Sequence, residues 1–135
     1  SALIRWQTRG LYSHAALLFD DDAVFEAWPG KGVRLRLLDR NDLEGITAFH
    51  VELSQTQEFM AREWAEAQLG KGYDYWGVAR FVTLGRFGSP KKLFCAEYVM
   101  GACDAAAASL FTRCEAWEPA PHQLSWSTKL TQVEL

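Results

Sequence analysis

The sequence predicts an α+β fold, with an antiparallel β-sheet packed against helices. Two observations support this class. The first half of the chain contains short apolar segments separated by turns rich in Asp, Gly and Pro, whereas the second half contains longer segments with helical signals. A length of 135 residues, with 49% hydrophobic and 23% charged residues, is typical of one folded domain, so residues 1–135 are expected to share a single core.

Four strands are expected in the first half of the chain. The segments are residues 11–19, 23–28, 33–37 and 46–53. The three aspartates at 20–22 predict a β-hairpin between the first two strands, and residues 29–32 predict the next turn. Residues 33–37 alternate apolar and charged side chains with period two, which is typical of a half-buried strand. Residues 2–8 fit either a short helix or an irregular lead-in.

Three helices are expected in the second half. They span about residues 55–69, 76–84 and 95–110. Ser54 suits the start of the first helix and Gly70 its end, and the alanine-rich run of the third has high helix propensity. A loop with Gly85, Gly88 and Pro90 separates the second helix from the third. The tail is expected to form a helical turn near residues 122–125 and a last strand at 130–135.

The charge of the chain argues against a nucleic-acid-binding protein. The formal net charge is -3 and the isoelectric point is about 5.6, whereas such a surface usually needs a basic field or stripe. No apolar run approaches the ~20 residues that span a bilayer, and the first residues lack the pattern of a secretory signal. We therefore expect a soluble chain without a transmembrane segment.

The three cysteines do not indicate a disulfide framework. Cys95, Cys103 and Cys114 cannot all pair within one chain, and no two have the spacing of a zinc knuckle or redox pair. At least one free thiol favours a reducing compartment, and hence slightly favours the cytoplasm, with indifference to redox state as the alternative. No histidines or cysteines have metal-ligand spacing, so no metal and no cofactor are expected.

Cys95 is the candidate nucleophile, because it is expected at the start of the third helix. A thiol at that position feels the positive end of the helix macrodipole, which favours the thiolate. The alternative is an inert buried thiol, which is the commoner state of a free cysteine. Cys103, expected within the helix, and Cys114, expected in a loop, are interpreted as inert.

A thiol nucleophile needs a base, and His14 is the candidate. It lies near the start of an apolar strand, from which its side chain can project from a sheet edge toward a helix terminus. A hydrogen-bonded structural histidine is the alternative. His50 alternates with apolar neighbours and fits that alternative better, and His122, between Pro121 and Gln123, reads as a loop residue.

Glu26 is the candidate for orienting the imidazole. It is an acid within an otherwise apolar strand, where burial without a partner would be costly. If the three aspartates form a three-residue loop, Phe19 pairs with Ala23 and His14 lies opposite Trp28, so that His14 and Glu26 share one face. A two-residue loop would place them on opposite faces. Another polar group could then orient His14.

Three short motifs together resemble the circularly permuted NlpC/P60 peptidases, a papain-like group that includes YiiX-like proteins and relatives of lecithin:retinol acyltransferase. The motifs are Tyr12-Ser13-His14-Ala15-Ala16-Leu17, Phe25-Glu26-Ala27-Trp28 and Phe94-Cys95-Ala96-Glu97-Tyr98-Val99. Their order carries the resemblance, since histidine precedes cysteine here and follows it in ordinary NlpC/P60 domains. The resemblance covers about residues 11–127 and includes the stretch Gly72-Tyr73-Asp74-Tyr75.

The resemblance implies a papain-like fold and a Cys-His-Glu triad. Cys95 is then the nucleophile, His14 the general base and Glu26 the residue that orients it. Four further residues are expected to contact substrate, with Tyr73 or Tyr75 also placed to assist an oxyanion hole: Ser13, Trp28, Tyr73 and Tyr75. Trp28, Trp76 and Phe94 are expected to form an apolar wall beside the site, and for these three residues ordinary core packing is the alternative.

The implied chemistry is acyl transfer through a thioacyl-enzyme. The primary hypothesis is hydrolysis of an amide bond in a peptidoglycan peptide or related molecule. A hydrolase or acyltransferase acting on a lipid-like ester or N-acyl amide is the second, and a peptide- or lipid-binding module without turnover is the third. The sequence leaves the scissile bond, the acceptor, the host compartment and the oligomeric state open.

Overall fold

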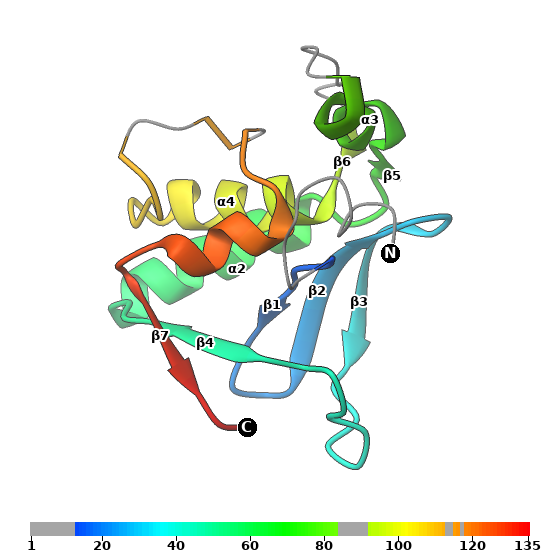
Figure 1. The fold of residues 1–135 in the computed structure, drawn as a ribbon. Helices are drawn as coiled ribbons and strands as arrows, with labels where there is room; N and C mark the ends of the chain where they lie inside the picture. The colour runs from blue at the N-terminus through cyan, green and yellow to red at the C-terminus, as the bar shows by residue number, and fades with distance from the viewer. Residues whose placement is uncertain (1–12, 84–91, 113–114, 117) are drawn as a thin grey trace.

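The computed structural model describes residues 13–83, 92–112, 115–116 and 118–135, and Figure 1 shows how their elements are arranged. Strands dominate the first part of the chain and helices the second, so the expected α+β class is confirmed. The elements are β1 (Leu17–Leu18), β2 (Ala23–Trp28), β3 (Gly32–Leu37), β4 (Ala48–Val51), α2 (Gln55–Ala67), β5 (Gly72–Tyr73), α3 (Tyr75–Thr83), β6 (Lys92–Leu93), α4 (Cys95–Ala105), the 3-10 helix η1 (Pro121–Trp126) and β7 (Leu130–Val133).

The strands of the described residues form three separate sheets, where one antiparallel sheet was expected. The largest has the antiparallel order β1-β2-β3, and β4 pairs antiparallel with β7. The third sheet is a parallel pair of two residues per strand, β5 and β6. A parallel pair needs a crossover connection, and α3 lies within that connection here. This pairing brings the residues before α3 beside the start of α4.

The first hairpin has the three-residue loop on which the shared face of His14 and Glu26 depends. Leu18 pairs with Val24, and the Phe19 amide donates to the Ala23 carbonyl at 3.0 Å. The register is therefore the expected one. Regular strand structure is shorter than predicted, covering only Leu17–Leu18 of residues 11–19, of which 11 and 12 lie outside the described residues.

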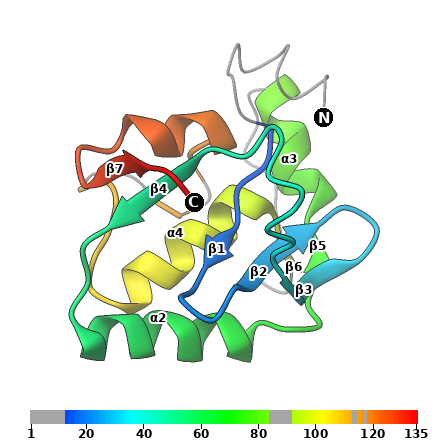
Figure 2. The same cartoon turned by 90° about the horizontal axis from the view of Figure 1, so that it is seen from below.

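The helices α2 and α4 run side by side, and α4 also packs against β2 (Figures 1 and 2). The core between them contains Phe25 and Phe94, which are fully or almost fully buried. Tyr98 of α4 is also fully buried, and its hydroxyl donates to the Ala65 carbonyl of α2 at 2.7 Å. A buried tyrosine hydroxyl needs such a partner, so this hydrogen bond and the apolar contacts fix α4 relative to α2.

The helix starts were predicted more accurately than the helix ends. Ser54 caps α2, with a reciprocal hydrogen-bonded pair to Gln57, and α4 begins at Cys95 as expected. However, α4 ends at Ala105, five residues before the predicted end. Ala107 adopts a left-handed φ of 53°, and its amide and that of Ala108 return to the carbonyls of the last turn. This is a Schellman termination, which helix propensity alone did not anticipate.

The remaining elements lie close to their predicted positions, except for β5 and β6, which were not predicted. The helix α3 begins one residue early, β4 and β7 are shorter than expected, and the helical turn in the tail is the six-residue η1. Predictions for residues 2–8, for the glycine- and proline-containing loop at 85–90 and for Cys114 fall outside the described residues. Within the described ranges, no helix is long and apolar enough to cross a membrane.

Candidate active site

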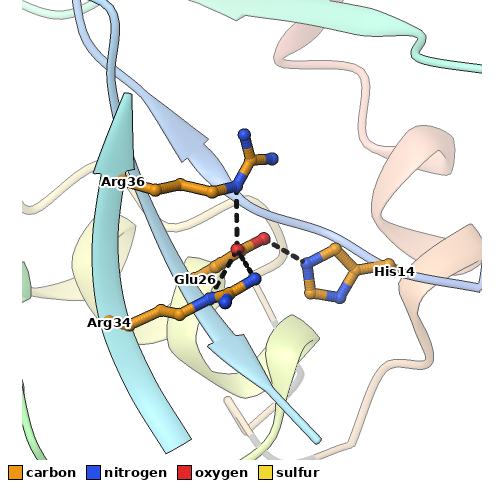
Figure 3. A network of polar contacts seen from close by, with 4 residues as sticks. All are labelled: His14, Glu26, Arg34 and Arg36. Atoms are coloured by element: carbon orange, nitrogen blue, oxygen red, sulfur yellow. Dashed lines mark hydrogen bonds and ion pairs between the residues drawn. The ribbon is translucent and has the colours of Figure 1, made fainter. Parts of the chain in front are cut away.

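His14 and Glu26 are in direct contact, as Figure 3 shows. Nε2 of His14 lies 2.9 Å from Oε2 of Glu26. His14 belongs to the segment that leads into β1, and Glu26 lies in the middle of β2. Continuing the observed pairing of β1 with β2 sets His14 opposite Trp28, and the two rings meet edge to face with centroids 4.9 Å apart. The carboxylate and the indole therefore hold the imidazole from two sides.

Glu26 is fully buried and is ionised despite its burial. Its Oε1 accepts hydrogen bonds from Nε of Arg34 and Nε of Arg36, both at 2.9 Å, and lies 2.7 Å from Nη2 of Arg34. Burial is the largest influence on the Glu26 carboxyl and raises its pKa, but the hydrogen bonds from His14 and the two arginines outweigh it, so that the pKa falls to about 2. The carboxylate is thus a negative charge held at Nε2 of the imidazole.

Cys95 is the first residue of α4 and is almost completely buried, with 1% of its surface exposed. It hydrogen-bonds with His14, and burial lowers the pKa of the imidazole while the hydrogen bonds and negative charges of Cys95 and Glu26 raise it, to a net value of about 9. Because Nε2 faces Glu26, Nδ1 is the ring nitrogen left for the sulfur. The imidazole therefore bridges sulfur and carboxylate.

Tyr73 is held beside Cys95 by the parallel pair of β5 and β6. Tyr73 lies opposite Leu93, and the Asp74 amide donates to the Leu93 carbonyl at 3.1 Å. Burial, and next the charge of Cys95, raise the pKa of the Tyr73 hydroxyl well above its usual value, and that hydroxyl also hydrogen-bonds with Cys95. Tyr73 is therefore a neutral donor at the sulfur.

The other expected substrate-contacting residues lie around this centre at different depths. Tyr75 is 57% exposed and packs edge to face on Tyr73 with centroids 5.0 Å apart. Trp28 is 38% exposed and contacts both His14 and the guanidinium of Arg34. Ser13 is half-buried beside His14, and no hydrogen bond among the described residues involves it. Trp28 and Tyr75 are thus solvent-accessible, whereas the burial of Tyr73 was not anticipated.

The remaining thiol and imidazoles of the described chain are separate from this centre. Cys103 is buried within α4, and burial raises its pKa to about 11, which agrees with its interpretation as inert. His50 is exposed on β4. His122 is buried in η1 and packs on Trp126, so its interpretation as an ordinary loop residue was wrong. In the described ranges no group of His, Cys, Asp and Glu side chains could hold a metal ion.

Arg34 and Arg36 are the site residues that sequence reasoning missed. The alternation of residues 33–37 suggested a strand with one buried face, yet Leu35 and Leu37 are 48% and 73% exposed and the arginines face Glu26. Counting across the turn at 29–31 pairs Glu26 with Arg34. The signal was thus present, as a lone acid opposite a basic residue in the neighbouring strand.

No known protein family model, curated protein or solved structure matches this chain.

Proposed function

We propose that this chain is a papain-like cysteine hydrolase that cleaves an amide bond through a thioacyl-enzyme. The observation that carries the proposal is the unbroken contact from Glu26 through the imidazole of His14 to the sulfur of Cys95 at a helix start. A nucleophile that contacts a base, which in turn contacts an acid that orients it, is the recurring arrangement of acyl-transfer enzymes. The pKa of His14, raised to about 9, keeps the imidazole protonated at neutral pH, as the acid that the leaving group needs.

Acylation starts with attack of the Cys95 sulfur on the amide carbonyl carbon. A carbon–sulfur bond forms and the carbonyl oxygen becomes an oxyanion. His14 then gives its proton to the leaving nitrogen, the carbon–nitrogen bond breaks, and an amine departs. The acyl group remains on Cys95 as a thioester.

Deacylation uses the same imidazole as a base. Neutral His14 takes a proton from water, the resulting hydroxide oxygen attacks the thioester carbon, and the carbon–sulfur bond breaks. A carboxylic acid leaves, and the thiolate and imidazolium are restored. Glu26 stays ionised throughout, because its low pKa makes it an electrostatic partner of the imidazolium and not a proton carrier.

Two kinds of donor are available for the oxyanion. The first backbone N–H groups of α4 have no partner within the helix, and the Tyr73 hydroxyl lies at the sulfur as a neutral donor. Loss of one such donor typically lowers kcat by about 10²–10³. Tyr73 is thus assigned to the oxyanion hole, and Tyr75 to the wall of the site.

A hydrolase or acyltransferase for a lipid ester or N-acyl amide is the second candidate. The observation in its favour is the start of α3, where Tyr75 and Trp76 are 57% and 71% exposed, directly after Tyr73. Amphipathic aromatic side chains of this kind suit an apolar acyl group. The chemistry at Cys95 is the same, and only the acceptor and the acyl chain differ.

Alkylation of Cys95 tests the proposal without knowledge of the substrate. Iodoacetamide is small enough for a buried sulfur, and mass spectrometry of peptides resolves each cysteine. An ordinary thiol slows about tenfold per pH unit below its pKa near 8.5, whereas Cys95 is expected to label nearly as fast at pH 6.5 as at pH 8. His14→Ala should abolish this advantage.

Cys103 serves as the internal control, since its pKa, raised to about 11 by burial, leaves it protonated and slow in both proteins. A pH dependence at Cys95 equal to that of an ordinary thiol would contradict the proposal. The same rate in His14→Ala as in the wild type would also contradict it. Either result would leave the binding module without turnover as the better hypothesis.

A further inference from the structure

The positively charged side chains around Glu26 outnumber the negative charges that they can pair with. Arg34 and Arg36 share one carboxylate, and of the acids in the described ranges only Glu26 lies within ion-pair distance of either. His14 adds a third positive charge at neutral pH, since its pKa is about 9. In the proposed mechanism, the thiolate of Cys95 and the Glu26 carboxylate balance two of the three. One positive charge therefore remains unmatched around Glu26.

Arg36 also has unused hydrogen-bond donors. Arg34 reaches Glu26 through Nε and Nη2, but Arg36 uses only Nε. In Figure 3 the two terminal nitrogens of Arg36 point away from the carboxylate. They have no partner in the part of the chain that the structure describes, and the side chain is 41% exposed. The outer edge of a guanidinium is the fork that binds a carboxylate through two parallel hydrogen bonds.

The unused fork of Arg36 lies within reach of a bound substrate. The route from His14 to it passes through Glu26 and two hydrogen bonds of 2.9 Å. With the intervening side-chain atoms this amounts to roughly 10 Å at most. An extended peptide covers about 3.3–3.6 Å per residue, so a group within three residues of the cleaved bond spans the distance.

From these contacts we infer that Arg36 is a specificity-determining residue, which binds a carboxylate of a peptide-like substrate close to the amide that Cys95 attacks. One unmatched charge and one free fork fit a single carboxylate, which is why a carboxylate is favoured over a doubly charged phosphate. Glu26 holds Nε of Arg36 and so sets the direction of the fork. The inference rests on the proposed function, because it concerns the substrate of that same site.

Competing alkylation by a charged and a neutral reagent tests whether the charge of Arg36 acts at Cys95. Iodoacetate carries a carboxylate and iodoacetamide does not, so the ratio of their rates at Cys95 reports local charge, and any change in the thiol itself cancels. A unit charge at roughly 10–15 Å in a medium of intermediate dielectric changes the ratio about two- to sixfold. Arg36→Gln should lower it by that factor.

Arg40→Gln is the matched control. Arg40 is an exposed arginine that pairs with Asp22 away from the site, so its loss changes the net charge equally and should leave the ratio unaltered. Arg36→Lys keeps the charge and should retain most of the ratio, which guards against misfolding of the glutamine variant. An unchanged ratio in Arg36→Gln, with Cys95 still reactive at pH 6.5, would overturn the inference and leave the proposed function intact.

Protection experiments test the binding of the carboxylate itself. N-acetylglutamate α-amide should slow iodoacetamide labelling of Cys95 in the wild type and in Arg40→Gln, whereas N-acetylglutamine α-amide should not. Arg36→Gln and Arg36→Lys should both lose the protection, because neither has a planar fork. Protection by inorganic phosphate at lower concentration than by the glutamate compound would overturn the assignment to a carboxylate. A Cys95 with ordinary reactivity in every protein would instead defeat the proposed function.

Discussion

Glu26 is the residue on which the local electrostatics of the site depend. It is fully buried and accepts from two arginines and His14, so each of these cations is oriented by the same carboxylate. A buried carboxylate is costly unless its lone pairs are satisfied, and here both oxygens are. The same contacts that lower its pKa to about 2 therefore also bind the β2–β3 hairpin to the segment that carries His14.

Glu26→Gln should reveal this role in the acid range. The folded-state pKa of Glu26 is depressed, so its contribution to stability is present above its ordinary pKa near 4.5 and is lost as the pH falls toward 2. The shift corresponds to about 3 kcal/mol. The wild type should lose that much unfolding free energy across this range, measured by urea denaturation followed through tryptophan fluorescence.

In Glu26→Gln the acid loss should be smaller by about 3 kcal/mol, and what remains comes from other carboxyls with lowered pKa values, such as Asp21 and Asp22. The variant should be destabilised at pH 7 by about 3–5 kcal/mol, because two guanidinium groups lose their counter-charge. Glu44→Gln, on an exposed loop, is the control and should behave as the wild type. A parallel acid dependence in the wild type and Glu26→Gln would show that Glu26 does not couple folding to protonation.

At the scale of elements, the contact of α2 with α4 decides where Cys95 lies. Gly101 of α4 faces Trp64 of α2, and a Cβ at Gly101 would meet the indole ring, with Cζ2 at 2.6 Å. The absence of a side chain at Gly101 allows the close approach of the two helices. Cys95 lies on the same helix, so its position beside His14 depends on this contact.

Gly101→Ala should destabilise the protein, although alanine favours an isolated helix by about 0.8–1.0 kcal/mol over glycine. The collision is with a large, packed ring, and overpacking of this kind costs about 1–3 kcal/mol, so we expect a net loss of about 1–2 kcal/mol in urea denaturation. Trp64→Phe should relieve the collision. The double variant should therefore be less destabilised than the two single changes predict together, and full additivity would show that Gly101 does not limit the approach.

At the scale of the whole molecule, the fold brings together residues from distant segments of the chain. His14 precedes the first strand, Tyr73 lies between α2 and α3, and Cys95 begins α4, and yet both His14 and Tyr73 hydrogen-bond with Cys95. The interaction of His14 with Cys95 depends on the packing of the sheet against α4. The interaction of Tyr73 with Cys95 depends on the parallel pairing of β5 with β6. The pKa of His14 therefore depends on contacts that exist only in the folded protein.

Titration of the three histidines by NMR should show His14 with a midpoint near 9. Its imidazolium then persists throughout the neutral range and is lost only above that value. Cys95→Ser removes the negative charge at the ring and should lower the midpoint by more than one unit, while the contact with Glu26 remains. His122, whose pKa is lowered by burial, is the control and should keep its midpoint. A His14 midpoint unaffected by Cys95→Ser would show that the two side chains are not coupled.

Much of the local structure was predictable because its signals are local. The aspartates at 20–22 marked the turn of the first hairpin, Ser54 marked the start of α2, and Cys95 was placed at a helix start. The end of α4 was predicted wrongly, because a hydrogen-bonded left-handed turn at Ala107 competed successfully with alanine-rich helix propensity. Local preferences differ by less than 1 kcal/mol per residue for most side chains, so tertiary context decides where a helix stops.

The sequence by itself determined the α+β class, the presence of the first hairpin and the identity of Cys95, His14 and Glu26 as candidates, since turn residues, periodicity and residue chemistry are written in neighbouring positions. Only the tertiary structure decided that Tyr73 is buried at the sulfur and that the described β-structure divides into three sheets. Those outcomes depend on which strands pair and which faces are covered. They are set by contacts between segments far apart in the chain, which no local pattern encodes.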